Sequence, residues 1–277
     1  MAKTEISNPD KVLFPKSKIK KKELIDYYSA VANKIIPYME ERPIAMKRFV
    51  NGISKEGFFQ KEAGEYFPSW IKRVRVKKET GSIEQVVVNK KETLKYLANQ
   101  DVIEFHLFLS NLKNLEKPDK IIFDLDAGEG QFKDIKKVAL AIREELDKIG
   151  AKSYVMTTGS RGLHVVVPIR QNVSFSESKK FALDIAKKID GKTTLEIRKE
   201  KRGNRVFIDI LRNNYAQLSV SPYSVRAKEG APIAMPISWS ELSGLKSAQQ
   251  FNIFNSLQRK DAWQGFGKKR FDVGKMR

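Results

Sequence analysis

The chain has no cysteine and only two histidines, His106 and His164, among its 277 residues. The lack of cysteine excludes disulfides, thiolate zinc sites and cysteine nucleophiles. A protein-held zinc ion would need both histidines together with carboxylates, an arrangement we do not expect. No apolar run approaches the roughly 20 residues of a membrane span, and the first residues, MAKTEISNPDK, lack the apolar core of a signal peptide. These absences predict a soluble, cytoplasmic protein.

Linkers and repeats are also missing. No low-complexity stretch, internal repeat or run rich in Pro, Gly and Ser divides the chain, and 41% of its residues are hydrophobic, enough for a packed core. We therefore predict a single domain over 1–277. Its core is expected at 5–265, and the basic segment 266–277 is expected to be a weakly ordered extension.

Acidic residues are scarce outside one region. The formal net charge is +20, and each successive block of fifty residues carries +4 or +5 except 101–150, which carries −3. A strongly basic chain favours a polyanionic partner such as nucleic acid. Lysines used for solubility, or the charged surface of a thermophile, would give the same balance. An acidic island in a basic protein is typical of metal-dependent phosphoryl transfer, because carboxylates hold the cations that meet phosphates.

Hydrophobic periodicity gives a coarse map of the secondary structure. Helices are expected at 20–39, 92–99, 132–149 and 175–189. Strands are expected at 44–50, 58–61, 71–77, 83–89, 102–109, 120–126, 153–158, 163–169, 205–211 and 218–225, with a hairpin tip at 77–82. Strands and helices mix without steady β-α-β alternation. We therefore expect an α+β fold with a central antiparallel-rich mixed sheet flanked by helices, preceded by a basic N-terminal subregion.

Three acids stand on strand-like segments. Asp124 and Asp126 end the apolar run 120–126, and a period of two places both on the same face of that strand. Carboxylates so arranged repel each other unless a cation lies between them, which suits Mg²⁺ or Mn²⁺. Two solvated acids capping the following loop, 127–130, would give the same pattern. Asp209 is the only charge in the apolar run 206–211, where a lone carboxylate is costly unless paired or metal-bound. The three acids together favour a two-metal site for phosphoryl transfer.

A glycine loop separates two of the expected strands. It reads TTGSRGLH over 157–164 and offers two hydroxyls, two glycines, an arginine and a histidine. Backbone N–H groups at glycine and the planar fork of Arg161 suit a triphosphate. The loop is neither a Walker A motif nor a dinucleotide-binding turn. It can equally be an ordinary hairpin loop, and His106 and His164 can equally be buried core histidines.

Taken together, these segments resemble the polymerase domain of bacterial ligase D and its stand-alone archaeal and bacterial relatives. That family belongs to the archaeo-eukaryotic primase superfamily and acts in non-homologous end joining. Nine stretches match in order along the chain. They are 10–15 (DKVLFP), 42–48 (RPIAMKR), 57–61 (GFFQK), 102–106 (VIEFH), 123–126 (FDLD), 158–164 (TGSRGLH), 206–209 (VFID), 221–226 (SPYSVR) and 232–239 (PIAMPISW). The resemblance implies a primase-like catalytic core.

The resemblance also implies a chemistry. Asp124, Asp126 and Asp209 would be the catalytic acids and hold two Mn²⁺ or Mg²⁺ ions, while a primer 3′-hydroxyl attacks the α-phosphate of a nucleoside triphosphate. Ribonucleotides would be preferred. The nucleotide-binding residues would be Lys47, His106, Thr158, Ser160, Arg161, His164 and Arg226.

It further implies a DNA interface and a cellular setting. Lys11 and Lys21 match lysines that hold a 5′-phosphate at a gap or break, Phe59 matches an aromatic that stacks on template bases, and the 77–82 tip matches a loop that aligns two DNA ends. The other expected DNA-binding residues are Arg48, Phe58, Lys61 and Arg202. The implied partners are gapped or broken DNA, a DNA ligase and a Ku-like end-binding protein, in the nucleoid of a prokaryote.

Three other functions fit parts of the same pattern. A de novo primase would carry the same acids. A metal-dependent nuclease usually needs an acid-x-lysine arrangement, for which the chain offers little beyond Glu196-Ile197-Arg198. A non-catalytic DNA-end-binding protein would show affinity that falls steeply with salt, although it would gain nothing from an acid at 209.

Overall fold

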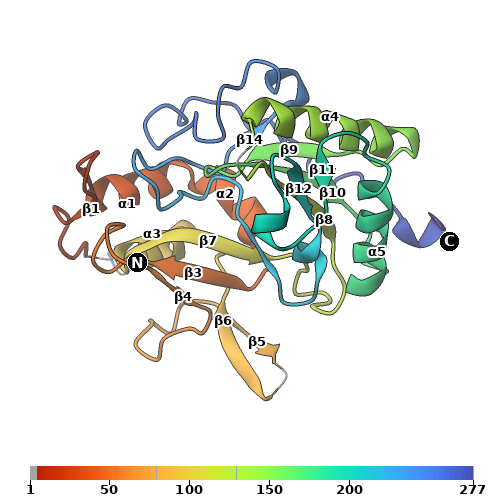
Figure 1. Ribbon diagram of the computed structural model, residues 1–277. Helices are drawn as coiled ribbons and strands as arrows, with labels where there is room; N and C mark the ends of the chain where they lie inside the picture. The colour runs from red at the N-terminus through yellow and green to blue at the C-terminus, as the bar shows by residue number, and fades with distance from the viewer. Residues whose placement is uncertain (1–4, 79, 129, 277) are drawn as a thin grey trace. The chain divides into compact units, whose positions relative to one another are not determined.

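The computed structural model describes residues 5–78, 80–128 and 130–276 (Figure 1). The chain divides into two compact units. Unit 1 comprises the described residues of Met1–Phe108 with Leu218–Ala234 and Phe251–Arg259. Unit 2 comprises those of Leu109–Gln217 with Met235–Gln250 and Lys260–Arg277. The chain therefore passes repeatedly from one unit to the other, and each unit is assembled from separate segments.

Unit 1 begins with a short antiparallel pair, β1 (Val12–Phe14) and β2 (Ile19–Lys20), followed by α1 (Lys21–Ala30) and α2 (Ala32–Met39). The single helix predicted over 20–39 is wrong, because the chain breaks at Val31, whose ψ is 3°. The Val31 N–H still bonds to the Tyr27 carbonyl oxygen, so α1 is capped where α2 begins. Pro37 is tolerated inside α2 near its end.

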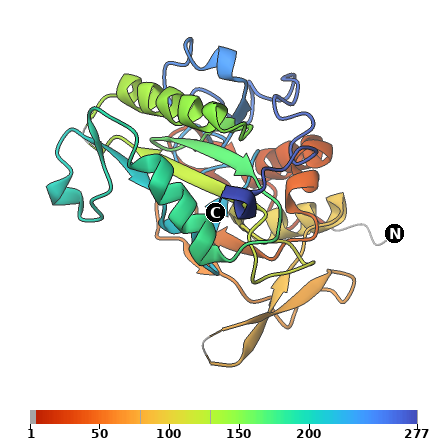
Figure 2. The same cartoon turned by 90° about the vertical axis from the view of Figure 1, so that its right-hand side faces the viewer.

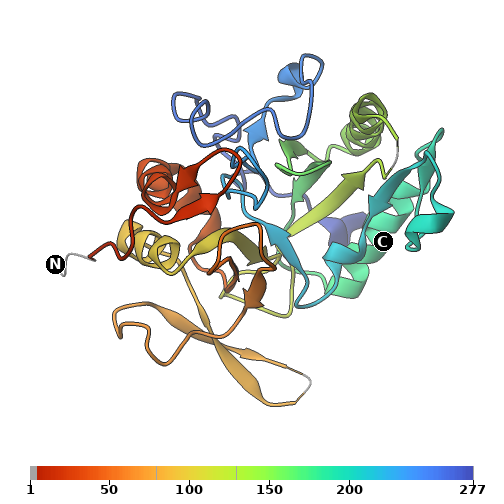
Figure 3. The same ribbon diagram turned by 60° about the vertical axis from the view of Figure 1, so that its left-hand side comes forward.

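A four-stranded sheet forms the centre of unit 1. Its order is β13-β7-β3-β4, and every pairing is antiparallel. The strands are β3 (Ile44–Arg48), β4 (Phe58–Gln60), β7 (Val102–Phe108) and β13 (Leu218–Val220). The helix α3 (Lys91–Asn99) packs against β7 and against α1, as Figure 3 shows. The Tyr28 hydroxyl fixes α1 to the sheet by donating to the Ile103 carbonyl oxygen at 2.7 Å.

The hairpin of β5 (Arg73–Lys77) and β6 (Ser82–Val86) projects from the rest of unit 1 (Figure 1). Five residue pairs hold its two strands in antiparallel register. The sequence predicts this tip at 77–82, and Gly81 turns the chain there with a φ of +78°. Residue 79 lies outside the described residues.

A six-stranded mixed sheet forms the centre of unit 2, in the order β11-β12-β8-β10-β9-β14. All neighbours are antiparallel except β11 and β12. The strands are β8 (Lys120–Asp126), β9 (Tyr154–Thr157), β10 (Leu163–Pro168), β11 (Thr193–Thr194), β12 (Val206–Asp209) and β14 (Pro236–Ile237). The predicted antiparallel-rich mixed sheet is therefore confirmed.

Two helices cover one face of the unit 2 sheet. The helices α4 (Phe132–Lys148) and α5 (Phe175–Ala186) contact both β8 and each other, so they lie on the same face (Figure 2). Ile135, Ile142 and Leu146 recur along the buried side of α4. Ser174 caps α5, because its hydroxyl accepts from the Glu177 N–H at 3.2 Å and Glu177 bonds back to the Ser174 N–H.

The last segment is packed on unit 2 rather than weakly ordered as predicted. Phe271 pairs with Ile169, and its N–H and C=O bond to Pro168 and Arg170. Val273 is buried in the final 3₁₀ turn, Val273–Met276. Three further 3₁₀ turns occur at Lys199–Lys201, Leu211–Asn213 and Trp239–Glu241. Among the described residues, no helix is long and apolar enough to span a membrane.

Candidate functional site

The three predicted acids lie on adjacent strands of unit 2. Asp124 and Asp126 leave β8 on the same face, as their spacing predicts. Asp209, the last residue of β12, is the register partner of Asp124. The antiparallel pairing of β8 and β12 therefore places three carboxylates on one face of the sheet.

Basic side chains surround these acids. His164 on β10 is the register partner of Asp124, and its Nε2 lies 3.4 Å from Asp124 Oδ1. The Arg212 Nε atom lies 3.3 Å from Asp124 Oδ2 and 3.6 Å from Asp209 Oδ2. Arg161 donates to Asp126 Oδ2 at 2.8 Å. Each acid thus has a cationic or imidazole partner within 4 Å.

The surroundings shift the pKa values of Asp124 and Asp209 in opposite directions. Burial raises the pKa of Asp124, but His164 and Arg212 outweigh burial and lower it to about 2. Burial raises the pKa of Asp209, and the neighbouring charge of Asp124 adds to this effect. A carboxyl beside a second carboxylate keeps its proton more readily unless a cation neutralises the pair.

The carboxylate oxygens of Asp124, Asp126 and Asp209 are chemically suited to bind divalent cations. Carboxylate oxygens are the ligands that Mg²⁺ and Mn²⁺ prefer. In the described part of the chain, no three His, Asp or Glu side chains are gathered as a ready-made metal cage. Arg161 and Arg212 form ion pairs with oxygens of Asp126 and Asp124. A metal ion would take over positions that these guanidinium groups hold.

The glycine loop between β9 and β10 is built on backbone contacts. A Cβ atom at Gly162 would lie 1.8 Å from the Leu125 carbonyl oxygen, so only glycine fits beside the acidic strand. Gly159 has a φ of +62°. The Thr158 hydroxyl donates to the Gly162 carbonyl oxygen and accepts from the N–H groups of Ser160 and Gly162. The predicted loop residues are therefore brought beside the acids, with the Thr158 hydroxyl engaged within the loop.

A cavity of about 300 Å³ lies beside Asp126 and Arg161. Arg202 also lines it, but the residue is 7% exposed. Its guanidinium carbon lies 3.6 Å from the centre of the Phe207 ring, and it donates to the carbonyl oxygens of Glu196 and Ile197. Arg202 therefore organises the 196–203 loop, and its contact with DNA stays a prediction.

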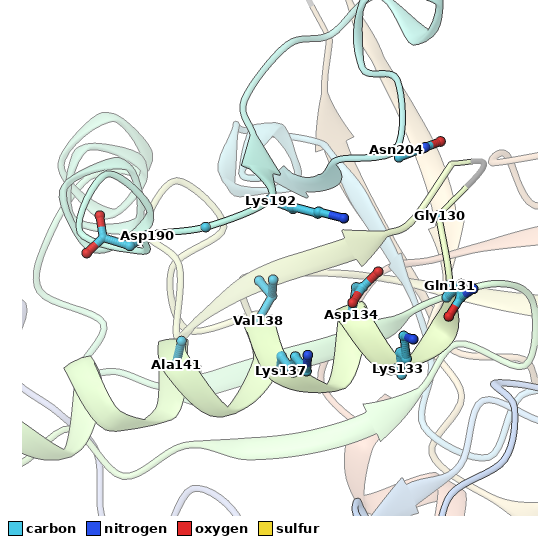
Figure 4. Close-up of a pocket in the computed structure, with 11 residues that line it drawn as sticks. Gly130, Gln131, Lys133, Asp134, Lys137, Val138, Ala141, Asp190, Lys192 and Asn204 are labelled. Carbon is cyan, nitrogen blue, oxygen red and sulfur yellow. The ribbon is translucent and has the colours of Figure 1, made fainter.

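A second cavity of unit 2, of about 680 Å³, lies along α4. Figure 4 shows Lys133 and Lys137 on the helix and Lys192 on the segment that faces it. Asp134 and Asp190 also line the cavity. It contains none of the acids predicted to be catalytic, and we assign it no ligand.

The remaining predicted nucleotide-binding residues gather on the sheet of unit 1. Lys47 on β3 is the register partner of Phe59 on β4 and of Glu104 on β7. The Lys47 Nζ atom lies 5.5 Å from the centre of the Phe59 ring, and the His106 ring meets that ring edge-on at 5.1 Å. Lys47, Phe59 and His106 thus form one cluster across three strands.

Glu104 lies beneath this cluster and is 3% exposed. Its Oε2 atom lies 2.9 Å from His106 Nε2 and 3.3 Å from Arg226 Nε, and its Oε1 atom accepts from the Ala227 N–H at 3.0 Å. Burial raises the pKa of Glu104, but His106 and Arg226 hold it well below the usual range. Burial lowers the pKa of His106, against the opposing effect of Glu104.

The two lysines predicted to hold a 5′-phosphate share an acid of unit 1. Lys11 Nζ lies 2.7 Å from Asp101 Oδ2, and Lys21 Nζ lies 3.0 Å from Asp101 Oδ1. Lys21 is 2% exposed and also donates to the Asn99 carbonyl oxygen at 2.8 Å. The structure therefore brings both lysines together around Asp101.

The predicted template-binding residues are more open. Phe58 and Phe59 are each 50% exposed, and Lys61 is exposed. Arg48 lies over the Phe58 ring and donates to Gln60 and to the Tyr66 hydroxyl. The end of the β3–β4 pair thus presents two half-exposed aromatic rings, Phe58 beside the Arg48 guanidinium group and Phe59 beside Lys47.

Sequence reasoning assigned no role to Glu104, Asp101 or Arg212. Glu104 had a signal, because it precedes His106 by two residues on the same strand and so shares its face. Arg212 follows Asp209 by three residues, one turn of the short helix that brings it back to the acids. Asp101 had no signal, because its contacts with Lys11 and Lys21 join segments about 80 to 90 residues apart.

Comparison with known proteins decides the family. The model of the family described as LigD, primase-polymerase domain, matches residues 20–265. The chain belongs to the LigD primase-polymerase family. The resemblance predicted from the nine motifs is therefore confirmed over most of the chain.

Full-length relatives of this family are larger proteins. The multifunctional non-homologous end joining protein LigD of Mycolicibacterium smegmatis is 30% identical over 248 residues, which are 87% of this chain and 32% of that protein. The Pseudomonas aeruginosa protein of the same name is 30% identical over 269 residues, covering 95% of this chain and 32% of that protein. The chain spans about a third of the length of these relatives.

A solved structure matches the fold. The polymerase domain of Mycobacterium tuberculosis ligase D, solved in complex with DNA, superposes with a TM-score of 0.87 at 27% identity. The match covers 96% of each chain. The α+β core is therefore that of a LigD polymerase domain.

Proposed function

We propose that this protein is a template-dependent nucleotidyltransferase that extends primers and fills gaps at DNA double-strand breaks during non-homologous end joining. The observation that carries the proposal is the cluster of Asp124, Asp126 and Asp209 beside the glycine loop of Arg161 and His164. Membership of a primase-polymerase family supports it.

In the proposed mechanism, the three acids would hold two Mg²⁺ or Mn²⁺ ions. When bound, such ions lower the pKa of an attacking hydroxyl and neutralise charge on the phosphates. The chain's own groups have separate tasks. Arg161, Lys47 and Arg226 carry positive charge for the triphosphate. The backbone at Gly159 allows close approach of phosphate oxygens, and we further propose that ribonucleotides are preferred.

For the DNA, we propose that the exposed rings of Phe58 and Phe59 stack on unpaired template bases, as aromatic residues do in other single-strand binders. Arg48 and Lys61 would neutralise the strand beside them. Lys11 and Lys21 would hold the 5′-phosphate across a gap. A structural neighbour solved in complex with DNA supports this proposal, and a DNA ligase and a Ku-like protein are the proposed partners.

Primer extension tests the proposal directly. Purified protein is incubated with Mn²⁺, ribonucleoside triphosphates and a duplex whose gap carries a 5′-phosphate, and the labelled primer should lengthen according to the template. The variant Asp124→Asn with Asp126→Asn should lose extension, whereas Asp147→Asn should retain it. Asp147 provides the matched control, because it makes an exposed ion pair with Arg143 on α4.

The alternative functions give different outcomes in the same assay. Shortening of the labelled DNA would indicate a nuclease, and salt-sensitive binding without turnover would indicate an end-binding protein. Dinucleotides formed on an unprimed single strand would indicate primase activity. Undiminished extension by the double variant would refute the assigned acids.

A further inference from the structure

A single buried carboxylate connects two groups that the proposed function assigns to the nucleotide. Glu104 contacts His106 through Nε2 and Arg226 through Nε with the same Oε2 atom. Its other oxygen accepts from the Ala227 N–H. The three contacts reach β7 itself and the segment that follows β13, so one side chain fixes parts of the chain about 120 residues apart.

Burying the Glu104 carboxylate costs free energy, which its partners must offset. A carboxylate that is 3% exposed loses most of its hydration and needs paired, hydrogen-bonded partners. Glu104 has hydrogen bonds with His106 and the Ala227 N–H group and an ion pair with Arg226. The His106 ring contacts Phe59 in the cluster with Lys47. A buried carboxylate with several fixed donors is a rigid support for the groups it holds.

We propose that Glu104 is the positioning residue that orients His106 and Arg226 toward the incoming nucleotide. This inference rests on the proposed function, and Glu104 itself does not touch the substrate. Its carboxylate accepts from His106 Nε2, which fixes the ring tautomer and leaves Nδ1 as the acceptor. The same oxygen forms an ion pair with Arg226, whose Nε atom lies 3.3 Å away, and this ion pair fixes the position of the guanidinium group.

The variant Glu104→Gln tests the role with little change in shape. The amide oxygen can still accept from the Ala227 N–H, but the side-chain charge is lost. Its NH₂ group cannot accept from His106 or Arg226. We expect the KM for the nucleoside triphosphate to rise roughly 10- to 100-fold, the range of one misaligned charge-assisted hydrogen bond. Affinity for the gapped DNA should stay within about twofold, because the contacts of Glu104 described above are with His106, Arg226 and Ala227, which are not among the residues proposed to bind DNA.

A spectroscopic readout makes the test independent of activity. The chain has two histidines, so the ring ¹⁵N spectrum holds two spin systems, assignable with a His106→Gln variant. In the unchanged protein His106 should be the Nε2–H tautomer. In Glu104→Gln it should become a mixture, with a lower pKa, because Arg226 and Lys47 then act on the ring unopposed. The signals of His164 should not change.

Asp119→Asn is the matched control. Asp119 is an acid of unit 2 that is 2% exposed and accepts a hydrogen bond from the Asn111 side-chain amide. If the KM for the nucleoside triphosphate rose only because the protein lost stability, Glu104→Gln and Asp119→Asn would raise it equally. Equal KM values in Glu104→Gln and Asp119→Asn, or an unchanged His106 tautomer in Glu104→Gln, would overturn the proposal. Failure of the unchanged protein to extend any primer would overturn the proposed function, while the tautomer measurement would still report on Glu104.

Discussion

The ion pair between Lys21 and Asp101 should be among the most sensitive points of unit 1. Lys21 is 2% exposed and Asp101 is 7% exposed, and their charged atoms lie 3.0 Å apart. The substitution Asp101→Asn removes the charge but keeps a residue that tolerates the left-handed φ of 61°. It leaves the Lys21 ammonium group buried with the Asn99 carbonyl oxygen as its acceptor.

The cost follows from the burial. Removing one partner of a buried ion pair costs about 3–5 kcal/mol, because the other charge is left uncompensated. We therefore expect the free energy of unfolding, measured in urea at pH 7, to fall by that amount. Asp26→Asn on α1 should cost less than about 0.5 kcal/mol, because Asp26 pairs with Lys22 on an exposed helix face.

A double variant separates charge from packing. Asp101→Asn combined with Lys21→Met removes both charges, so most of the lost stability should return. Phosphate offers a second rescue under the proposed function. A gapped duplex with a 5′-phosphate should stabilise Asp101→Asn more than it stabilises the unchanged protein, because an anion replaces the missing carboxylate. An Asp101→Asn variant within 1 kcal/mol of the unchanged protein, or a double variant as unstable as the single one, would refute the reasoning.

Three further predictions concern the acids, the glycine loop and the exposed aromatic residues. Gly162→Ala should destabilise the protein by roughly 3 kcal/mol in urea, because its Cβ would meet the Leu125 carbonyl oxygen, while Gly244→Ala, whose nearest neighbour atom is 3.8 Å away, should be close to neutral. The lowered pKa of Asp124 adds stability that is present above its usual value of 3.8 and lost as the pH falls toward about 2; Asp124→Asn in chelator should flatten acid unfolding over that range, and an unchanged slope would contradict this. Phe59→Ala should weaken binding of a fluorescent single strand roughly 5- to 100-fold at constant salt without changing the melting temperature, and equal affinity would exclude base stacking at this ring.

Periodicity predicted the long elements well. The strand predicted at 120–126 and β8 have the same bounds, because its apolar run is buried along its length and ends at the acids. The very short strands β1, β2, β11 and β14 were missed, since two or three residues carry no period and depend on a distant partner. The break at Val31 was missed for a different reason. No glycine or proline marks it, and apolar residues continue on both sides.

The candidate site was predictable to the extent that it is local. The spacing of Asp124 and Asp126 determined their common face, and the apolar surroundings of Asp209 marked it as unusual. Pairing between β8 and β12 brings the third acid to the first two, and such register is not encoded in either strand alone. The same holds for Arg212, whose partner Asp124 lies 88 residues earlier.

The order of strands in unit 1 has a consequence for synthesis on the ribosome. In β7 every residue except His106 is buried, and one of its two neighbours is β13, which begins at Leu218. A nascent chain must therefore lengthen by roughly a hundred residues after β7 before this edge can be paired. During that interval an apolar strand edge stays open to other strands. Chaperone demand and aggregation during expression should therefore depend on how quickly residues 109–217 are translated and folded.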